Sequence, residues 1–197
     1  MRRKTIDLIF IVVQAICIVG LFTTNSFDYM RIAIGDLIFW LVYIILELKQ
    51  KWTIPLYIRT VVILSILSNS VFGEFINLYV SSVFYDRLQH IFGTYSMTLW
   101  AFFVIQQFVK IRFINKKFII IFIVSLSVTL GTFYEINEFF QDEFFKPIIK
   151  NQPSLLDTDL DLISDLLGGI IALFHYLFST SLKSFKFPFE EELITRK

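Results

Sequence analysis

Runs of about 20 mostly apolar residues recur along the chain, and they constrain its fold more than any other feature. A helix needs roughly 20 such residues to cross the hydrocarbon core of a bilayer, whereas a helix on the surface of a soluble domain has one polar face. We therefore predict an all-α, polytopic membrane protein with about six transmembrane helices in one bundle. The expected spans are approximately 6–23, 32–48, 55–73, 88–109, 118–140 and 160–179.

The composition agrees with a membrane location. Hydrophobic residues make up 56% of the 197 residues and charged residues only 18%, so the chain is more apolar than soluble domains are. The formal net charge of +1 gives no electrostatic basis for binding nucleic acid, and we expect the lipid bilayer as the main partner. Because the sequence has no long polar linker or internal repeat, residues 1–197 are expected to form a single integral membrane domain.

The distribution of lysine and arginine predicts the orientation of the bundle. Short cytoplasmic loops of membrane proteins carry an excess of these residues. With six spans, all the basic segments fall on one side, so both termini are expected to be cytoplasmic. The segments are residues 2–4, 49–51, 110–117 and 182–197.

Polar side chains on the last three expected spans gather toward the opposite, outer surface. They recur every three or four residues, and residues at this spacing share one helix face. A charged side chain costs about 2.5–3.5 kcal/mol at the bilayer centre, so these groups are expected to face one another or a wet cavity. The fourth span carries Asp86 and His90, the fifth Glu135 and Glu138, and the sixth Asp157, Asp161 and Asp165.

A cluster of this kind favours metal chemistry. Carboxylates packed within a few ångströms cannot all stay ionised without a counter-charge, so they share protons, pair with cations or hold a metal. An imidazole with Asp and Glu oxygens suits zinc, manganese or iron. We expect a divalent metal ion, whose identity the sequence does not assign. The expected ligands are His90, Glu135, Asp161 and Asp165, with Glu138 or Asp86 as the general base or as the partner of a ligand.

Further polar residues are expected around this cavity. Asp157, Asp36 and Arg31 lie at matching depth, although an ion pair between Arg31 and Asp36 explains those two equally well.

Arg59 interrupts the third span and is expected to extend to the inner headgroups. The three tryptophans are expected to face lipid or its interface. The stretch "NQPSLLDTD" predicts the start of the last helix, with its cap within 157–159.

The polar motifs also resemble those of a known family. "DRLQHIFG", then "FYEINEFF", then "DTDLDLISDLLGG" are similar to the YjdF-like bacterial inner-membrane proteins and, more distantly, to VanZ-like proteins. The resemblance covers approximately residues 84–178. It implies a multi-pass protein of the bacterial cytoplasmic (inner) membrane and, through the VanZ link, a role in glycopeptide-antibiotic tolerance or other cell-envelope processes. It implies no particular reaction.

These observations lead to one favoured function and two alternatives. We expect an acidic, His-containing cavity open to the outer side, with a divalent-metal site that acts on or recognises a lipid or cell-wall precursor headgroup. One alternative is a small proton- or cation-coupled transporter that uses the same acids. The other is a non-catalytic membrane partner whose polar network only orients helices. The sequence does not decide whether the protein is an enzyme.

Overall fold

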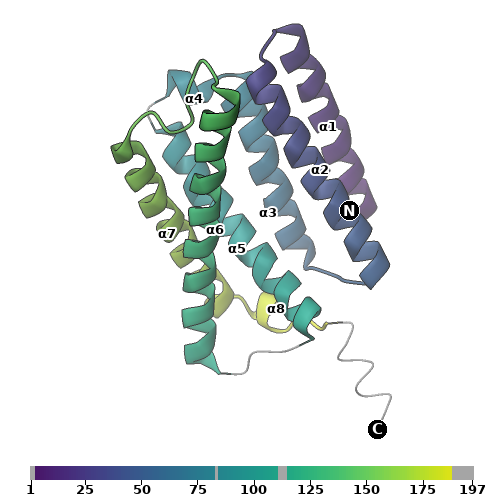
Figure 1. The fold of residues 1–197 in the computed structure, drawn as a ribbon. Helices are drawn as coiled ribbons and strands as arrows, with labels where there is room; N and C mark the ends of the chain where they lie inside the picture. The colour runs from purple at the N-terminus through teal and green to yellow at the C-terminus, as the bar shows by residue number, and fades with distance from the viewer. Residues whose placement is uncertain (1–2, 83, 111–114, 188–197) are drawn as a thin grey trace.

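The computed structural model describes residues 3–82, 84–110 and 115–187, and every regular element within these ranges is a helix. Six long helices stand side by side, with short helices at their ends (Figure 1). The elements are α1 (Arg3–Thr23), α2 (Phe27–Gln50), α3 (Leu56–Leu67), the π-helix η1 (Ser68–Phe75), α4 (Leu78–Ser81), α5 (Tyr85–Val109), α6 (Lys116–Phe145), α7 (Leu155–Phe178) and α8 (Thr180–Lys183).

Four helical stretches are long and apolar enough to cross a membrane: Arg3–Thr23, Leu56–Phe75, Lys116–Phe145 and Leu155–Phe178. Even the shortest of them, with 20 residues, extends about 30 Å. The helices α2 and α5 have 24 and 25 residues and lie beside these four (Figure 1). The prediction of an all-α membrane protein with several spanning helices is confirmed.

The long helices form two groups of three. One group contains α1, α2 and α3, the other contains α5, α6 and α7, and α3 packs against α5 to join them. A Cβ atom on Gly168 of α7 would collide with the backbone of α5, and one on Gly169 would collide with Ser127 of α6. These two glycines therefore let α7 approach both neighbours closely, as small residues do in membrane bundles.

Apolar side chains cover the outside of the bundle as well as filling one half of its inside. Ile16, Leu48 and Ile121 are more than 60% exposed, as expected for side chains that contact lipid. The buried core contains apolar side chains from all six long helices together with Ile54, which precedes α3. Its members include Ile6, Phe10, Trp40, Tyr43, Ile54, Ile58, Val62, Ile63, Leu99, Phe102, Phe103, Ile119, Ile123 and Ala172. The other half of the interior is polar, and that half holds the site described below.

Several helix boundaries differ from the sequence-based expectation, among them the start of α2 at Phe27 rather than residue 32 and the end of α6 at Phe145 rather than residue 140. The third span ends in the π-helix η1, so it reaches Phe75 rather than residue 73. The last helix begins at Leu155, five residues earlier than expected, because Ser154 caps it by accepting a hydrogen bond from the backbone N–H of Asp157 at 3.2 Å. The expected cap within 157–159 is wrong, since the serine after Pro153 already satisfies the first turn.

The position of the Arg59 side chain contradicts the expectation that it extends to the inner headgroups. Its side chain is fully buried rather than extended toward headgroups. One guanidinium nitrogen donates to Asp7 at 2.7 Å, and another donates to both oxygens of Glu47. Trp40, which is also fully buried, donates its indole N–H to Asp7 at 3.1 Å, so this tryptophan does not face lipid. The network ties α1, α2 and α3 together at the end of the bundle opposite the acidic cluster.

Candidate functional site

His90 lies at the centre of the acidic cluster, in the second turn of α5, and four carboxylates surround its two ring nitrogens. On one side, Nδ1 lies 3.2 Å from Asp165 Oδ1 and 3.9 Å from Glu135 Oε1. On the other side, Nε2 lies 3.7 Å from Asp86 Oδ1 and 3.9 Å from Asp161 Oδ1. The imidazole therefore stands between two pairs of carboxylates that come from α5, α6 and α7.

The imidazole belongs to two groups of three residues whose candidate ligand atoms all lie within 4.8 Å of one another and could hold a metal ion. His90, Glu135 and Asp165 form one group, in which all three residues are buried; His90, Asp86 and Asp161 form the other. Atoms bound tetrahedrally to one ion at 2.0–2.1 Å lie about 3.3 Å apart. The observed separations of 3.2–3.9 Å approach this value.

Helical periodicity explains how separate segments meet here. Asp86 and His90 are four residues apart on α5, and Asp161 and Asp165 are four apart on α7, so each pair projects from one helix face. On α6, Gly131 lies one turn before Glu135 and faces Asp165 of α7. A Cβ atom at Gly131 would overlap the Asp165 side chain. The glycine thus leaves room for the Asp165 carboxylate between α6 and α7.

Other side chains orient the carboxylates. The Thr94 hydroxyl donates to Asp165 Oδ1, the atom that also faces His90. Gln152, in the loop before α7, donates to Glu135 Oε2 at 2.7 Å. That loop is held in place by Asp142, whose Oδ2 accepts the backbone N–H of Gln152 at 2.9 Å. The pattern of charged residues in the sequence did not point to Thr94, Gln152 or Asp142.

Arg87 is the arginine that pairs with these carboxylates within the described residues, and it lies toward the Nε2 side of the imidazole. It donates to Asp157, lies 3.3 Å from Asp86 Oδ2 and places Nε 3.7 Å from Asp161 Oδ1. Asp157 is therefore occupied by an ion pair. This side of the cluster is compensated by protein charge.

Such compensation is absent on the Nδ1 side, where no lysine or arginine of the described residues forms an ion pair with Glu135 or Asp165. Around His90, four buried carboxylate oxygens have no hydrogen-bond partner within the described residues: Glu135 Oε1, Glu138 Oε2 and Asp165 Oδ2, together with Asp161 Oδ1 on the Nε2 side. Leaving buried acceptors unsatisfied costs about 1–3 kcal/mol each, and more for charged groups. The donor set fits a divalent cation, which would satisfy such oxygens and neutralise their charge.

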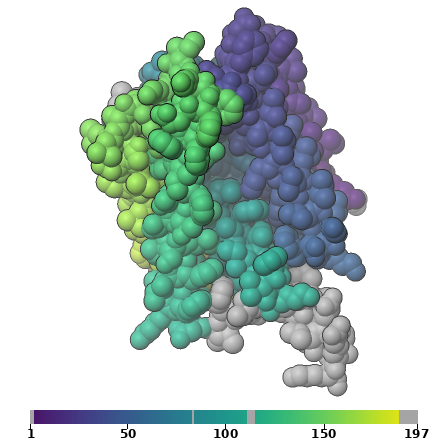
Figure 2. All heavy atoms as spheres, viewed as in Figure 1, coloured from purple at the N-terminus to yellow at the C-terminus, as the bar shows by residue number. Residues whose placement is uncertain are grey.

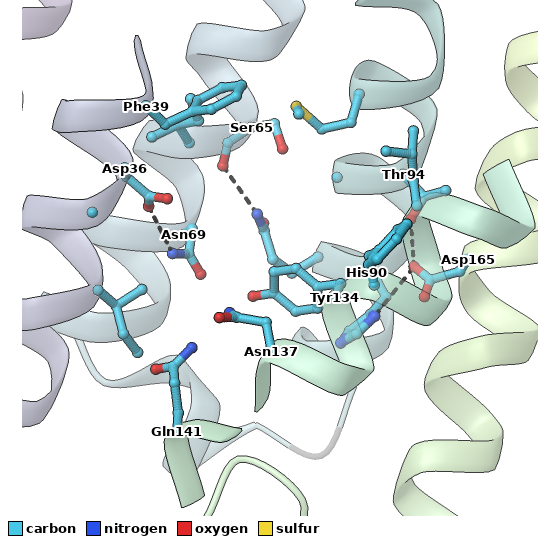
Figure 3. A pocket seen from close by; sticks show the side chains of 18 of the residues that line it. Asp36, Phe39, Ser65, Asn69, His90, Thr94, Tyr134, Asn137, Gln141 and Asp165 are labelled. Atoms are coloured by element: carbon cyan, nitrogen blue, oxygen red, sulfur yellow. Dashed lines mark hydrogen bonds and ion pairs between the residues drawn. The ribbon is translucent and has the colours of Figure 1, made fainter. Parts of the chain in front are cut away.

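The cluster opens onto a cavity of about 700 Å³, a size typical of small-molecule sites. His90 and Asp165 form one wall and Asp36 and Asn69 the opposite wall, with Tyr134 between them (Figure 3). Much of the remaining lining is apolar, including Ile32, Phe39, Met97, Leu130 and Phe133.

A second polar cluster lies at the wall opposite His90, where Asp36 and Asn69 line the cavity. Asn69 of η1 donates its amide to Asp36 Oδ2 at 3.3 Å and to Glu74 Oε1 at 3.2 Å. Tyr79 donates its hydroxyl to Asn69 Oδ1 at 2.5 Å. Desolvation raises the pKa of the Tyr79 phenol well above its ordinary value, so this hydroxyl keeps its proton.

The structure thus brings most of the residues expected from the sequence to one end of the bundle. Arg31 and Asp36 both line the cavity but do not pair with each other. Arg31 instead contacts Asp28 at 2.6 Å, and its guanidinium lies 4.3 Å from the centre of the Phe145 ring. The ion pair between Arg31 and Asp36 that we considered is wrong, because a residue one turn earlier on α2 takes the arginine.

Comparison with known proteins gives the chain a family. The family described as "Predicted membrane protein (DUF2238)" matches residues 6–181. The chain belongs to this family. An uncharacterized protein of Thermotoga maritima is 33% identical to this DUF2238 member over 139 residues, which cover 68% of the chain and 71% of the relative. No solved structure matches the chain.

The DUF2238 match agrees with part of the resemblance read from the motifs. DUF2238 is the family of the YjdF-like proteins, and the Thermotoga relative is bacterial. The match does not extend to the VanZ-like resemblance. The family description states a membrane protein and names no ligand or reaction.

Proposed function

We propose that the protein holds a divalent metal ion in the outer half of its membrane bundle and uses it to recognise or act on the headgroup of a lipid or a cell-wall precursor. The observation that carries this proposal is the set of buried carboxylate oxygens around His90 that have no hydrogen-bond partner among the described residues. A metal supplies the missing positive charge. The adjoining cavity, with its largely apolar lining, supports an amphiphilic substrate.

The electrostatics favour the Nδ1 side for the ion. Arg87 already compensates Asp86, Asp157 and Asp161, and its charge would repel a cation placed among them. We therefore assign His90 Nδ1, Glu135 and Asp165 as ligands. His90 Nε2 then faces Asp86 Oδ1 at 3.7 Å and Asp161 Oδ1 at 3.9 Å, and the negative charge of these carboxylates favours a proton on Nε2, which leaves Nδ1 free to bind the ion.

A divalent ion at this position would act as a Lewis acid toward a phosphoryl or carbonyl oxygen. Glu138 lies one helical turn from Glu135, and its Oε2 has no hydrogen-bond partner within the described chain. Glu138 is therefore the group best placed to accept a proton from a reacting water. Asp86, which contacts Arg87 and faces His90, serves as an orienting partner in this scheme.

The proposal includes a location and a topology. We place the protein in the bacterial cytoplasmic membrane with six spans, both termini inside and the acidic cluster outside. The basic residues Lys49, Lys51 and Lys110 lie at the end opposite the cluster, which agrees with the positive-inside rule. Labelling of intact cells tests this: Ser154→Cys should react with a membrane-impermeant thiol reagent and Lys51→Cys should not, in a Cys17→Ala background.

Elemental mass spectrometry of protein purified without chelator tests the metal. The wild type should contain close to one divalent ion per chain, and His90→Ala and Asp161→Asn should contain less, with the larger loss in His90→Ala because it removes a ligand. Asp159→Asn, at an exposed position on α7, is the matched control and should keep the ion. Wild-type protein that stays metal-free after supplementation with zinc, manganese and magnesium would contradict the proposal.

A further inference from the structure

The helix α6 carries a second polar face that the acidic cluster does not use. Tyr134, Asn137 and Gln141 follow one another at intervals of three and four residues, so they share one face of the helix. All three line the cavity, and Figure 3 shows their side chains pointing into it. Ile136 and Phe139, which do not line the cavity, are apolar and exposed, as contact with lipid requires. The neutral polar face is therefore directed at the cavity.

This face has hydrogen-bonding groups that the protein does not use. Within the described residues, none of its three side chains forms a hydrogen bond. The Tyr134 ring packs edge-on against the His90 imidazole, with 5.2 Å between the ring centroids, and its hydroxyl points into the cavity (Figure 3). An amide offers two N–H donors and a carbonyl acceptor, and a phenol both donates and accepts. Such groups are costly on a membrane-spanning helix unless a ligand or water binds them.

The charged groups of the cavity, in contrast, are already engaged. Arg31 pairs with Asp28 at 2.6 Å. Asp36 accepts a hydrogen bond from an amide N–H at 3.3 Å. Asp165, which is only 2% exposed, belongs to the proposed metal site. The remaining hydrogen-bonding capacity is mostly neutral, and it favours an uncharged ligand whose groups both donate and accept.

Aromatic rings complete the lining. Phe39 lies on the α2 side of the cavity, and Phe133 and Phe145 lie on the α6 side. A sugar ring has apolar C–H faces and a rim of hydroxyl groups, each of which both donates and accepts a hydrogen bond. Its faces can pack on aromatic rings while its hydroxyls bind amides and a phenol. A sugar therefore fits this lining better than an ionic headgroup does.

The cavity also has a route to the lipid. The space-filling view shows a recess between α2 and α6 on the side of the bundle (Figure 2). Ile32 of α2 and Leu130 of α6 border the cavity, so apolar side chains line both sides. Gly35 of α2 also lines it, and a Cβ atom there would have no atom within 4 Å. An acyl chain can therefore lie between these two helices while its headgroup occupies the cavity.

We propose that the cavity binds the sugar headgroup of a membrane glycolipid, with Tyr134, Asn137 and Gln141 as its hydrogen-bonding residues and with the acyl chains lying between α2 and α6. This proposal rests on the proposed function, since it names the substrate class of the same cavity. The sugar hydroxyls satisfy the neutral face of α6. The same sugar then lies beside His90 and Asp165, which line the cavity next to Tyr134.

Native mass spectrometry of the full-length protein tests this in a polyoxyethylene alkyl ether detergent, which has no sugar that competes. The probes are equimolar monoglucosyldiacylglycerol, diacylglycerol and phosphatidylglycerol with the same acyl chains. Wild-type protein should retain the glucolipid with roughly tenfold or greater preference, and Tyr134→Phe, Asn137→Ala and Gln141→Ala should each reduce it about 2- to 10-fold. Thr132→Ala, at an exposed position of α6 outside the cavity, is the matched control and should keep it. Equal retention of the three lipids by the wild type would overturn the proposal.

Two further arms separate the possible outcomes. Methyl glucoside, which lacks acyl chains, should not displace the bound lipid at equal concentration, and efficient displacement would refute a membrane lipid as the source of the sugar. Metal content measured on the same samples distinguishes the two proposals. Gln141→Ala should lose lipid preference and keep metal. Metal-free wild type that still prefers the glucolipid would contradict only the metal site, whereas metal-loaded wild type without this preference would overturn only the glycolipid proposal.

Discussion

Replacement of Gly168 by alanine should separate α5 from α7 and loosen the site. A Cβ atom at this position would lie 3.0 Å from the backbone nitrogen of Tyr95 and closer still to the carbonyl oxygen of Ile91. Both are backbone atoms of α5, so no side-chain rotation relieves the overlap. Ordinary contact requires the two helices to separate by about 1 Å, and overpacking of this kind typically costs about 1–3 kcal/mol.

The same change should weaken metal binding, because Asp165 lies one turn from Gly168 and faces His90 across this helix contact. Unfolding in a titration with sodium dodecyl sulfate, followed by circular dichroism, measures the stability, and metal titration measures the affinity. Gly35→Ala is the matched control, since a Cβ there would contact nothing within 4 Å, and it should leave both quantities unchanged or slightly higher. Wild-type stability in Gly168→Ala would refute the close α5–α7 packing described above.

Three other changes test separate parts of the structure. Arg59→Met leaves the largely buried carboxylates of Asp7 and Glu47 without their cation and should lower the free energy of unfolding by about 3–5 kcal/mol in the same detergent titration; a loss below about 1 kcal/mol would contradict the ion-pair network. Gln152→Ala removes the donor to Glu135 and should reduce metal affinity about 10- to 100-fold in an equilibrium titration, while stability changes little; unchanged affinity would contradict its orienting role. Metal affinity should rise with pH because a proton competes for the His90 nitrogen, and His90→Ala should reduce that slope; identical slopes would count against His90 as a ligand.

Hydrophobic runs were sufficient to predict the helices, because an apolar stretch of membrane length has few alternatives to a helix. The helical repeat was also sufficient to place His90 and the acids of α5, α6 and α7 on inward faces. These residues contact one another because the polar residues of the three helices lie at the same depth in the bundle. The sequence therefore indicated the composition of the cluster, although not which nitrogen of His90 faces which carboxylate.

Contacts between distant segments were beyond this reasoning. Whether Arg59 extends to headgroups or turns inward depends on Asp7, which lies 52 residues away. Gln152 reaches Glu135 only because Asp142 folds the intervening loop. The π-helix Ser68–Phe75 carries no propensity signal that separates it from an α-helix, yet it brings Asn69 to the cavity wall and Glu74 to the Asn69 amide.

The most direct test of the central claim is the X-ray absorption spectrum of the metal-loaded protein at the edge of the bound metal. Ligation by His90, Glu135 and Asp165 predicts a first shell of nitrogen and oxygen, with outer-shell scattering from one imidazole that disappears in His90→Ala. A bound ion whose wild-type spectrum shows no imidazole scattering would contradict the claim that His90 is the centre of a metal site.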